Sequence, residues 1–173
     1  MRIELRTDTA DETRDVGEAL AGLLAPRDTV VLTGDLGAGK TTLVQGIGRG
    51  LGVDEHVSSP TFTLIREYAG RLDVAHVDVY RLERVQDVVD LGLDEVGGPD
   101  RVLIVEWGDA VEDLLPAERL RIEVTAPDPG PERRRFVIES RGGSWAARWE
   151  RLEQMLRSWV PATDDAVGNG ATG

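Results

Sequence analysis

Residues 29–41 of the chain read TVVLTGDLGAGKT, an apolar run followed by a glycine-rich segment. Residues 29–33 contain β-branched side chains with almost no polar interruption, a pattern that predicts a strand covered on both faces, as in a parallel sheet. Residues 34–41 match G-x-x-x-x-G-K-S/T without a mismatch and lie directly before a helical pattern. This order of strand, glycine-rich loop and helix predicts a phosphate-binding loop.

The predicted loop brings together the groups that bind a nucleotide. Its glycines let backbone N–H groups, including those of Gly37, Ala38 and Gly39, curl around an anion at a helix N-terminus. Lys40 is expected to reach the β- and γ-phosphates, and the Thr41 hydroxyl is expected to bind Mg²⁺. Lys40 is also the only lysine of the chain, since the other 19 basic residues are arginines. We therefore predict a nucleotide site.

Such a loop needs an acidic residue at the end of a neighbouring strand to hold the water shell of the metal. Asp78 and Glu106 are the two candidates, because both follow apolar stretches. Glu106 follows the purer buried strand and is favoured, whereas Asp78 ends an alternating segment closer to a sheet edge. His76 is interpreted as structural, because two histidines and no cysteine make a metal cluster a weak hypothesis.

Two further segments each allow two interpretations. Residues 58–63, SSPTFT, lie where P-loop hydrolases place a hydroxyl-bearing loop that senses the γ-phosphate, but an ordinary Ser/Thr-rich loop would look alike. Arg133, Arg134 and Arg135 precede a predicted strand, so their side chains alternate between faces. In one interpretation, one of these arginines approaches the nucleotide or a partner. In the other, all three form a solvated charge cluster.

The rest of the chain predicts one three-layer α/β domain of the P-loop type over residues 1–160. A capping box at Thr9 opens a helix that ends near Pro26. Glycines 46, 48, 50 and 52 in the helix of residues 40–51 are interpreted as packing closely on the sheet. Residues 61–68 and 72–80 predict an antiparallel hairpin that extends a mostly parallel sheet. We also expect a helix over residues 83–91 and strands over residues 101–105, 120–124 and 136–139.

The C-terminal part is predicted to be a helix followed by a tail. Ser144 is expected to cap this helix, whose apolar stripe belongs to the core and comprises Trp145, Trp149, Leu152, Leu156 and Trp159. Residues 161–173 are small and polar and are expected to be disordered.

Composition narrows the possible partners. The chain has 173 residues, no cysteine and a net charge of -12, which opposes unaided binding to a nucleic acid. Its apolar runs stay below the ~18 residues of a membrane span, and its start lacks a secretory signal. We expect a cytoplasmic protein without membrane contact.

Four strings together resemble the TsaE family, formerly called YjeE: GDLGAGKTT at residues 34–42, SPTFTL at 59–64, HVDVYRL at 76–82, and Glu106-Trp107. The resemblance covers roughly residues 9–110. It implies a small bacterial ATPase required for the N6-threonylcarbamoyl modification of adenosine beside the anticodon of tRNA. It also implies that the chain acts with TsaB and with the transferase TsaD, and that it meets tRNA only through that complex.

The resemblance implies ATP and Mg²⁺ as cofactors and carries roles onto matching residues. It implies that Lys40 contacts the phosphates and that Thr42 belongs to the same nucleotide-binding loop. Thr41 and Glu106 are implied to be linked to the metal.

It also implies a part in hydrolysis for Asp78, a switch-like loop around Thr61, and a place in the nucleotide site for Trp107. Gly108 and Asp109 follow this tryptophan where many members carry proline.

Two other functions use the same loop. A small-molecule kinase would transfer the phosphate to an acceptor, and a nucleotide-dependent binding switch would show negligible turnover. The favoured hypothesis is a weak ATPase that its partners stimulate.

Overall fold

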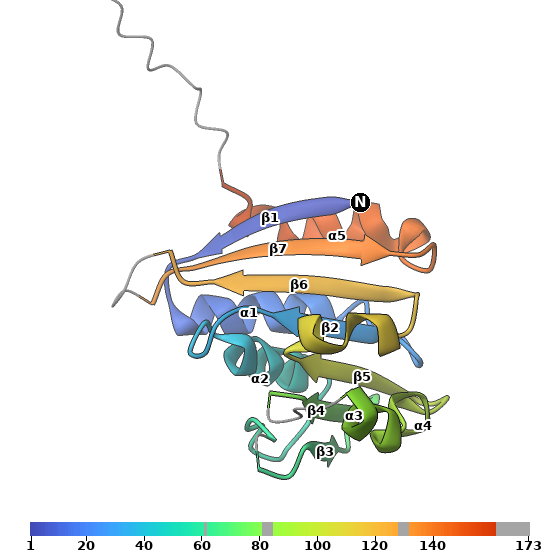
Figure 1. Ribbon diagram of the computed structural model, residues 1–173. Helices are drawn as coiled ribbons and strands as arrows, with labels where there is room; N and C mark the ends of the chain where they lie inside the picture. The colour runs from blue at the N-terminus through green and yellow to red at the C-terminus, as the bar shows by residue number, and fades with distance from the viewer. Residues whose placement is uncertain (61, 81–84, 128–131, 162–173) are drawn as a thin grey trace, which may run out of the picture.

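The computed structural model describes residues 1–60, 62–80, 85–127 and 132–161. Its centre is a seven-stranded sheet in the order β1-β7-β6-β2-β5-β4-β3 (Figure 1). The strands are β1 (Arg2–Thr7), β2 (Thr29–Thr33), β3 (Ile65–Tyr68), β4 (Asp73–Asp78), β5 (Arg101–Glu106), β6 (Arg119–Thr125) and β7 (Arg134–Arg141). β6, β2, β5 and β4 run parallel, β3 is antiparallel at one edge, and β7 and β1 are joined by antiparallel pairing at the other. The predicted sheet and its hairpin are confirmed.

Five α-helices and three short 3₁₀ helices accompany the sheet in the described residues. They are α1 (Ala10–Ala21), α2 (Lys40–Gly50), α3 (Val85–Leu91), α4 (Leu93–Gly97), α5 (Trp149–Leu156), η1 (Gly108–Leu114), η2 (Ala146–Arg148) and η3 (Arg157–Trp159). Among these residues, no helix is both long and apolar enough to cross a bilayer.

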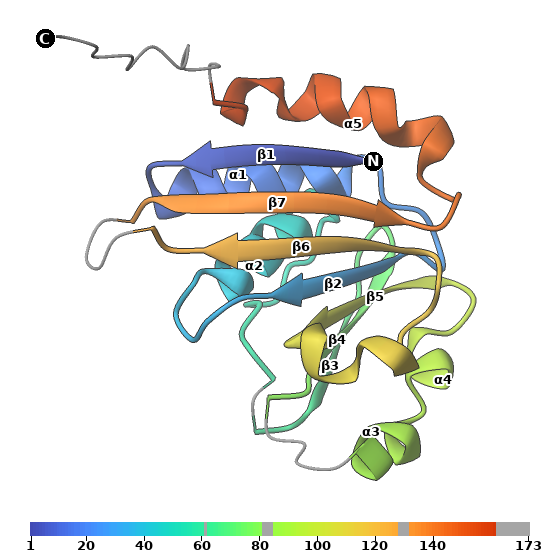
Figure 2. The same cartoon turned by 45° about the horizontal axis from the view of Figure 1, so that its top comes forward.

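The sheet has a hydrophobic core on each face, because successive side chains of a strand point to opposite sides. Val30 and Leu32 of β2 belong to the cluster that α1, α2 and α5 cover, whereas Val31 belongs to a second cluster that includes Leu93 of α4 and Val111 of η1. Figure 1 shows α1 and α2 behind the sheet and η1 in front of it. Figure 2 shows α5 running beside β1.

The predicted Thr9 cap of α1 is present, but the reciprocal bond of the capping box goes to the N–H of Asp8 instead of that of Thr9. The Thr9 side chain accepts the N–H of Glu12 at 3.1 Å, and the Glu12 carboxylate accepts the N–H of Asp8 at 2.7 Å. These bonds satisfy backbone donors at the helix start, which lie outside the helical ladder.

Gly46 and Gly50 of α2 pack against another helix and Gly48 packs against Val53 and Val57, so the expectation that these glycines pack on the sheet was wrong. A Cβ on Gly46 would lie 2.1 Å from the backbone oxygen of Arg14, and one on Gly50 would lie 2.8 Å from that of Glu18. Both neighbours belong to α1. Gly46 and Gly50 therefore let two helix backbones approach each other on one face of the sheet.

Several predicted bounds differ from the structure, and two of these differences have a visible local cause. β3 begins at Ile65 because the N–H groups of Thr63 and Leu64 both bond to the oxygen of Pro60, which makes a turn. Ser144 does not cap the last helix: its N–H bonds to Glu118 at 2.6 Å, and η2 precedes α5. β1 was not predicted at all.

The stripe assigned to the core is confirmed, with four buried members and a partly buried Trp159. Thr61, the start of the predicted helix at residues 83–84, and residues 162–173 of the tail lie outside the described residues.

Candidate functional site

The predicted phosphate-binding loop, residues 34–41, connects β2 to α2 at the carboxyl ends of the parallel strands (Figure 1). Gly34 has a φ of 130°, and a Cβ there would lie 2.0 Å from the backbone oxygen of Val124 in β6. Gly39, the N-cap of α2, has a φ of 106°. Both positions require glycine, because other residues are strained at such φ values. The sequence of the loop is therefore dictated by its backbone path.

Lys40 is held inside this loop. Its side chain donates to the backbone oxygens of Gly34 at 2.7 Å and Asp35 at 2.9 Å, and the residue is only 4% exposed. Its Nζ also lies 3.8 Å from the centre of the Trp107 ring. A buried ammonium group among carbonyl oxygens and an aromatic face is a fixed positive charge at the start of a helix.

Trp107 follows β5 directly and adopts a left-handed backbone conformation, with a φ of 63°. Its ring centre lies 4.6 Å from that of Tyr80, which follows β4. A non-glycine residue at positive φ is uncommon, and such strain concentrates at functional sites. The two rings form an aromatic wall beside Lys40.

Thr41, the residue after Lys40, contacts Glu106 at the end of β5. The Thr41 hydroxyl donates to the Glu106 carboxylate, with distances of 3.0 and 3.3 Å to its two oxygens. Glu106 is 2% exposed and also lies 2.9 Å from Nε2 of His76. A hydroxyl beside a carboxylate is a set of hard oxygen donors that suits Mg²⁺. The residues present therefore fit this ion.

Asp78 lies beside Glu106, since the two residues are paired in the register of β4 and β5. Its carboxylate accepts the Ser59 hydroxyl at 2.9 Å and the backbone N–H of Tyr80 at 2.9 Å. Asp78 thus connects the end of β4 to the segment that contains Ser58, Ser59 and Pro60, which we call the Ser-Pro loop. Glu106, rather than Asp78, contacts the Thr41 hydroxyl.

The described residues around these groups line a pocket of about 400 Å³, within the range of small-molecule sites. They are Leu36, Gly37, Gly39, Lys40, Thr41, Thr42, Ser59, Asp78, Tyr80, Glu106 and Trp107. Of the residues expected in the nucleotide site, Ala38 is absent from this lining: it is buried in the core and its N–H bonds to the oxygen of Asp35. Ser59 and Tyr80 were not among the predicted site residues, although both stand in the strings that carry the resemblance.

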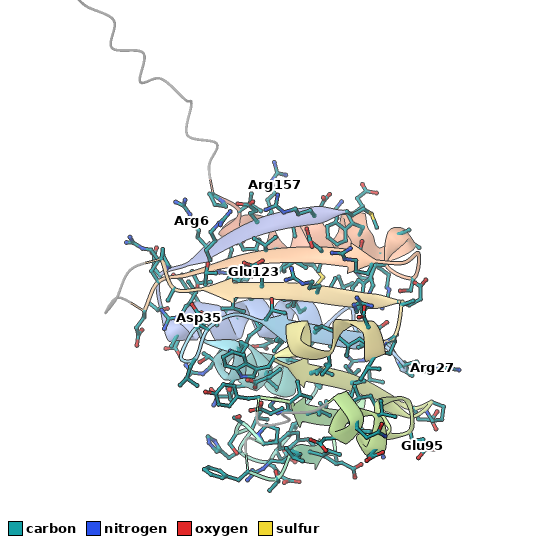
Figure 3. The ribbon with its side chains drawn as sticks, viewed as in Figure 1. Arg6, Arg27, Asp35, Glu95, Glu123 and Arg157 are labelled. Carbon is teal, nitrogen blue, oxygen red and sulfur yellow. The ribbon has the colours of Figure 1, made fainter. Side chains whose placement is uncertain are left out.

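A larger cavity of about 1060 Å³ lies at the opposite ends of the strands. In Figure 3, Arg27 and Glu95 mark that end, and Asp35 marks the end with the phosphate-binding loop. Arg148 in this cavity donates to both carboxylate oxygens of Asp28, at 2.6 and 2.8 Å. None of the sequence motifs contributes to it, so the smaller pocket is the candidate site.

The three consecutive arginines separate in the structure. Arg133 pairs with Asp8 at 2.9 Å and Arg135 pairs with Glu4 at 2.7 Å, and the hydrogen bond from Arg135 lowers the pKa of the Glu4 carboxyl. The side chain of Arg134 packs against Gly39, because its Nε would lie 3.2 Å from a Cβ there. Two of the three thus form surface ion pairs, and one covers the phosphate-binding loop.

Comparisons with known proteins agree on one family. The family model described as "Threonylcarbamoyl adenosine biosynthesis protein TsaE" matches residues 7–136. The chain is 39% identical to the Bacillus subtilis (strain 168) protein named "tRNA threonylcarbamoyladenosine biosynthesis protein TsaE", with 88% of this chain and 95% of that protein covered. It is 42% identical to the Streptomyces coelicolor protein of the same name, with 77% and 93% covered.

A solved structure is also similar. The crystal structure of Bacillus subtilis YdiB superposes with a TM-score of 0.73 at 37% sequence identity, and the match covers 91% of this chain and 96% of that one.

Proposed function

The chain belongs to the TsaE family of threonylcarbamoyl adenosine biosynthesis proteins, and from that premise we propose that it binds and hydrolyses Mg-ATP in the formation of threonylcarbamoyladenosine in tRNA. The observation that carries the proposal is the convergence of Lys40, Thr41 and Glu106 in one pocket at the carboxyl ends of β2 and β5. Ligands of open α/β sheets bind at this edge.

The polar groups of the pocket have distinct parts in this proposed chemistry. Backbone N–H groups of the loop and the Lys40 ammonium would hold the phosphates of ATP, since both present positive charge to an anion. Thr41 and Glu106 would hold Mg²⁺, which supplies charge neutralisation at the phosphate oxygens when bound. Asp78 would act in hydrolysis, since it is anchored to Ser59 and lies beside Glu106.

Hydrolysis requires the Ser-Pro loop to be in place over the terminal phosphate. Asp78 and Tyr68 both tie this loop to the sheet: Asp78 bonds to the Ser59 hydroxyl, and the Tyr68 hydroxyl bonds to the backbone oxygen of Ser58 at 3.1 Å. We propose that the partners TsaB and TsaD complete the ordering of this loop, with Thr61 in it, and thereby raise a weak basal ATPase. The net charge of -12 is the reason to propose contact with tRNA only through that complex.

The first prediction concerns Lys40, because the chain has no other lysine to replace its charge. Lys40→Ala removes charge-assisted hydrogen bonds worth about 1.5–3 kcal/mol, so Mg-ATP affinity or turnover should fall roughly 10- to 150-fold. Binding of a fluorescent ATP analogue and release of phosphate measure the two quantities. Arg6→Ala, which removes an exposed cation, is the control and should change neither.

Retained hydrolysis in Lys40→Ala would contradict the proposal. Phosphate that appears only when a small-molecule acceptor is added, and then on that acceptor, would favour the kinase instead. Tight nucleotide binding with negligible phosphate release under every condition would favour the binding switch.

A further inference from the structure

His76 is a buried histidine in contact with the proposed metal carboxylate. Its side chain is 0% exposed, and its Nε2 lies 2.9 Å from Oε1 of Glu106. In the register of β4 and β5, His76 stands opposite Ile104. Two residues further along both strands, Asp78 stands opposite Glu106. Because side chains alternate along a strand, His76 and Glu106 lie on the same face of the sheet, the face that α2 covers.

The hydrogen bonds of His76 decide which ring nitrogen carries a proton. A carboxylate oxygen only accepts hydrogen bonds, so Nε2 must be the donor to Glu106. Nδ1 is buried and has no hydrogen-bond partner among the described residues. An unprotonated Nδ1 avoids burying an N–H group without an acceptor, which is costly. The arrangement therefore favours the tautomer in which Nε2 alone is protonated.

Glu106 is held from two sides as a result. His76 donates from β4, and the Thr41 hydroxyl donates from the start of α2. Oε1 is the nearer oxygen to both donors, and Oε2 lies 3.3 Å from the Thr41 hydroxyl. If Thr41 turns its hydroxyl toward a metal ion, the bond from His76 is the one that continues to fix the carboxylate.

We infer that His76 is a positioning residue: through Nε2 it fixes the Glu106 carboxylate in the orientation that faces Thr41, and so sets the affinity of the nucleotide site for Mg²⁺. This inference rests on the proposed function. Groups that orient a metal-binding side chain through a hydrogen bond commonly change metal affinity or activity when they are replaced. His76 acts through Glu106 and does not line the pocket of the described residues.

Three variants of the full chain test this inference. His76→Leu removes the donor, His76→Gln places an amide N–H near the position of Nε2, and Ile104→Val is the control, since it removes one methylene from the residue paired with His76. Binding of a fluorescent ATP analogue is measured in EDTA and across a Mg²⁺ titration. His76→Leu should weaken the apparent Mg²⁺ affinity by roughly 10-fold or more, while binding in EDTA stays within about twofold of wild type.

His76→Gln should regain most of the Mg²⁺ affinity, and Ile104→Val should retain it. Three results would each overturn the inference: an unchanged Mg²⁺ dependence in His76→Leu, equal losses in His76→Gln and His76→Leu, or the same loss in Ile104→Val. The last two would mean that any disturbance of this part of the core has the effect.

A second measurement needs neither nucleotide nor metal, and so covers the case in which His76→Leu does not fold. Long-range ¹H–¹⁵N spectra of the wild-type protein should show a proton on Nε2 of His76, and Glu106→Gln should shift that ring signal. A proton on Nδ1 instead would overturn the inference. A wild type that binds nucleotide without any Mg²⁺ effect would overturn the proposed function, and the spectra would still decide the hydrogen bond.

Discussion

At the scale of single residues, the site depends on two carboxylates that are neighbours in space and differ in their partners. Glu106 faces the Thr41 hydroxyl and His76, whereas Asp78 accepts the Ser59 hydroxyl and the N–H of Tyr80. The Glu106 carboxylate therefore contacts the start of α2, and the Asp78 carboxylate contacts the Ser-Pro loop. This difference is our reason for proposing a metal-linked role for Glu106 and a role in hydrolysis for Asp78.

Glu106→Gln is predicted to weaken Mg²⁺-dependent hydrolysis more than nucleotide binding, because the amide keeps the shape of the side chain and removes the charge that acts through the metal. A loss in turnover on the order of 10- to 100-fold is expected, with binding in EDTA nearly unchanged. Steady-state phosphate release and binding of a fluorescent ATP analogue measure the two effects.

Glu95→Gln is the matched control, since Glu95 is exposed at the opposite end of the molecule (Figure 3). If Glu106→Gln hydrolysed ATP as fast as wild type while Asp78→Asn lost its Mg²⁺ dependence, the metal-linked role would pass to Asp78.

At the scale of elements, the close contact between α1 and α2 could not be predicted from the glycines of α2 alone. Glycine weakens an isolated helix by up to ~1 kcal/mol relative to alanine, so Gly46→Ala would stabilise α2 if nothing touched it. In the structure, the added Cβ would meet the Arg14 backbone oxygen at 2.1 Å. The two effects have opposite signs, and the steric one is larger because backbone atoms of a packed helix cannot move aside easily.

Gly46→Ala is therefore predicted to lower the free energy of unfolding by about 1–3 kcal/mol, the usual cost of overpacking. Urea denaturation measures the change. Gly143→Ala is the control, since no atom lies within 4 Å of its added Cβ, and it should alter stability little. An increase in stability for Gly46→Ala would mean that α1 and α2 are not packed as closely as described.

The elements also show what the sequence could predict. The bounds of β2 follow from a short run that is rich in β-branched residues, and the start of α1 follows from Thr9 and Glu12, because these signals are local. β1 carries the alternation of apolar and charged residues that is typical of a strand with one buried face, so its existence could have been predicted, whereas its pairing with β7, more than a hundred residues away in the chain, could not. The cap expected at Ser144 failed because the 3₁₀ helix η2 precedes α5, so that α5 begins only at Trp149 and its N-cap position is Arg148.

The same division holds in the site. The loop, Lys40, Thr41 and Glu106 could be predicted because a motif and a strand end position them. The bond between His76 and Glu106 could not, since it depends on which residues of β4 and β5 stand side by side. Neither could the split of the three arginines, which follows from acidic residues on β1 and just after it.

At the scale of the whole molecule, the candidate pocket opens at one end of a strongly acidic protein. The net charge of -12 opposes direct binding to tRNA, and Leu36, Phe62 and Tyr80 are large apolar residues exposed at the end of the sheet that carries the pocket. These features agree with a protein whose nucleotide site works together with partner proteins.

The most direct test of this account is the steady-state rate of phosphate release from ATP by the purified protein alone, with TsaB and TsaD, and with tRNA alone, at low and physiological salt. The account predicts a low rate for the protein alone and for the protein with tRNA, and a higher rate with the partner pair. The increase should disappear in Lys40→Ala. Stimulation by tRNA without the partners, or no stimulation by the pair, would contradict it.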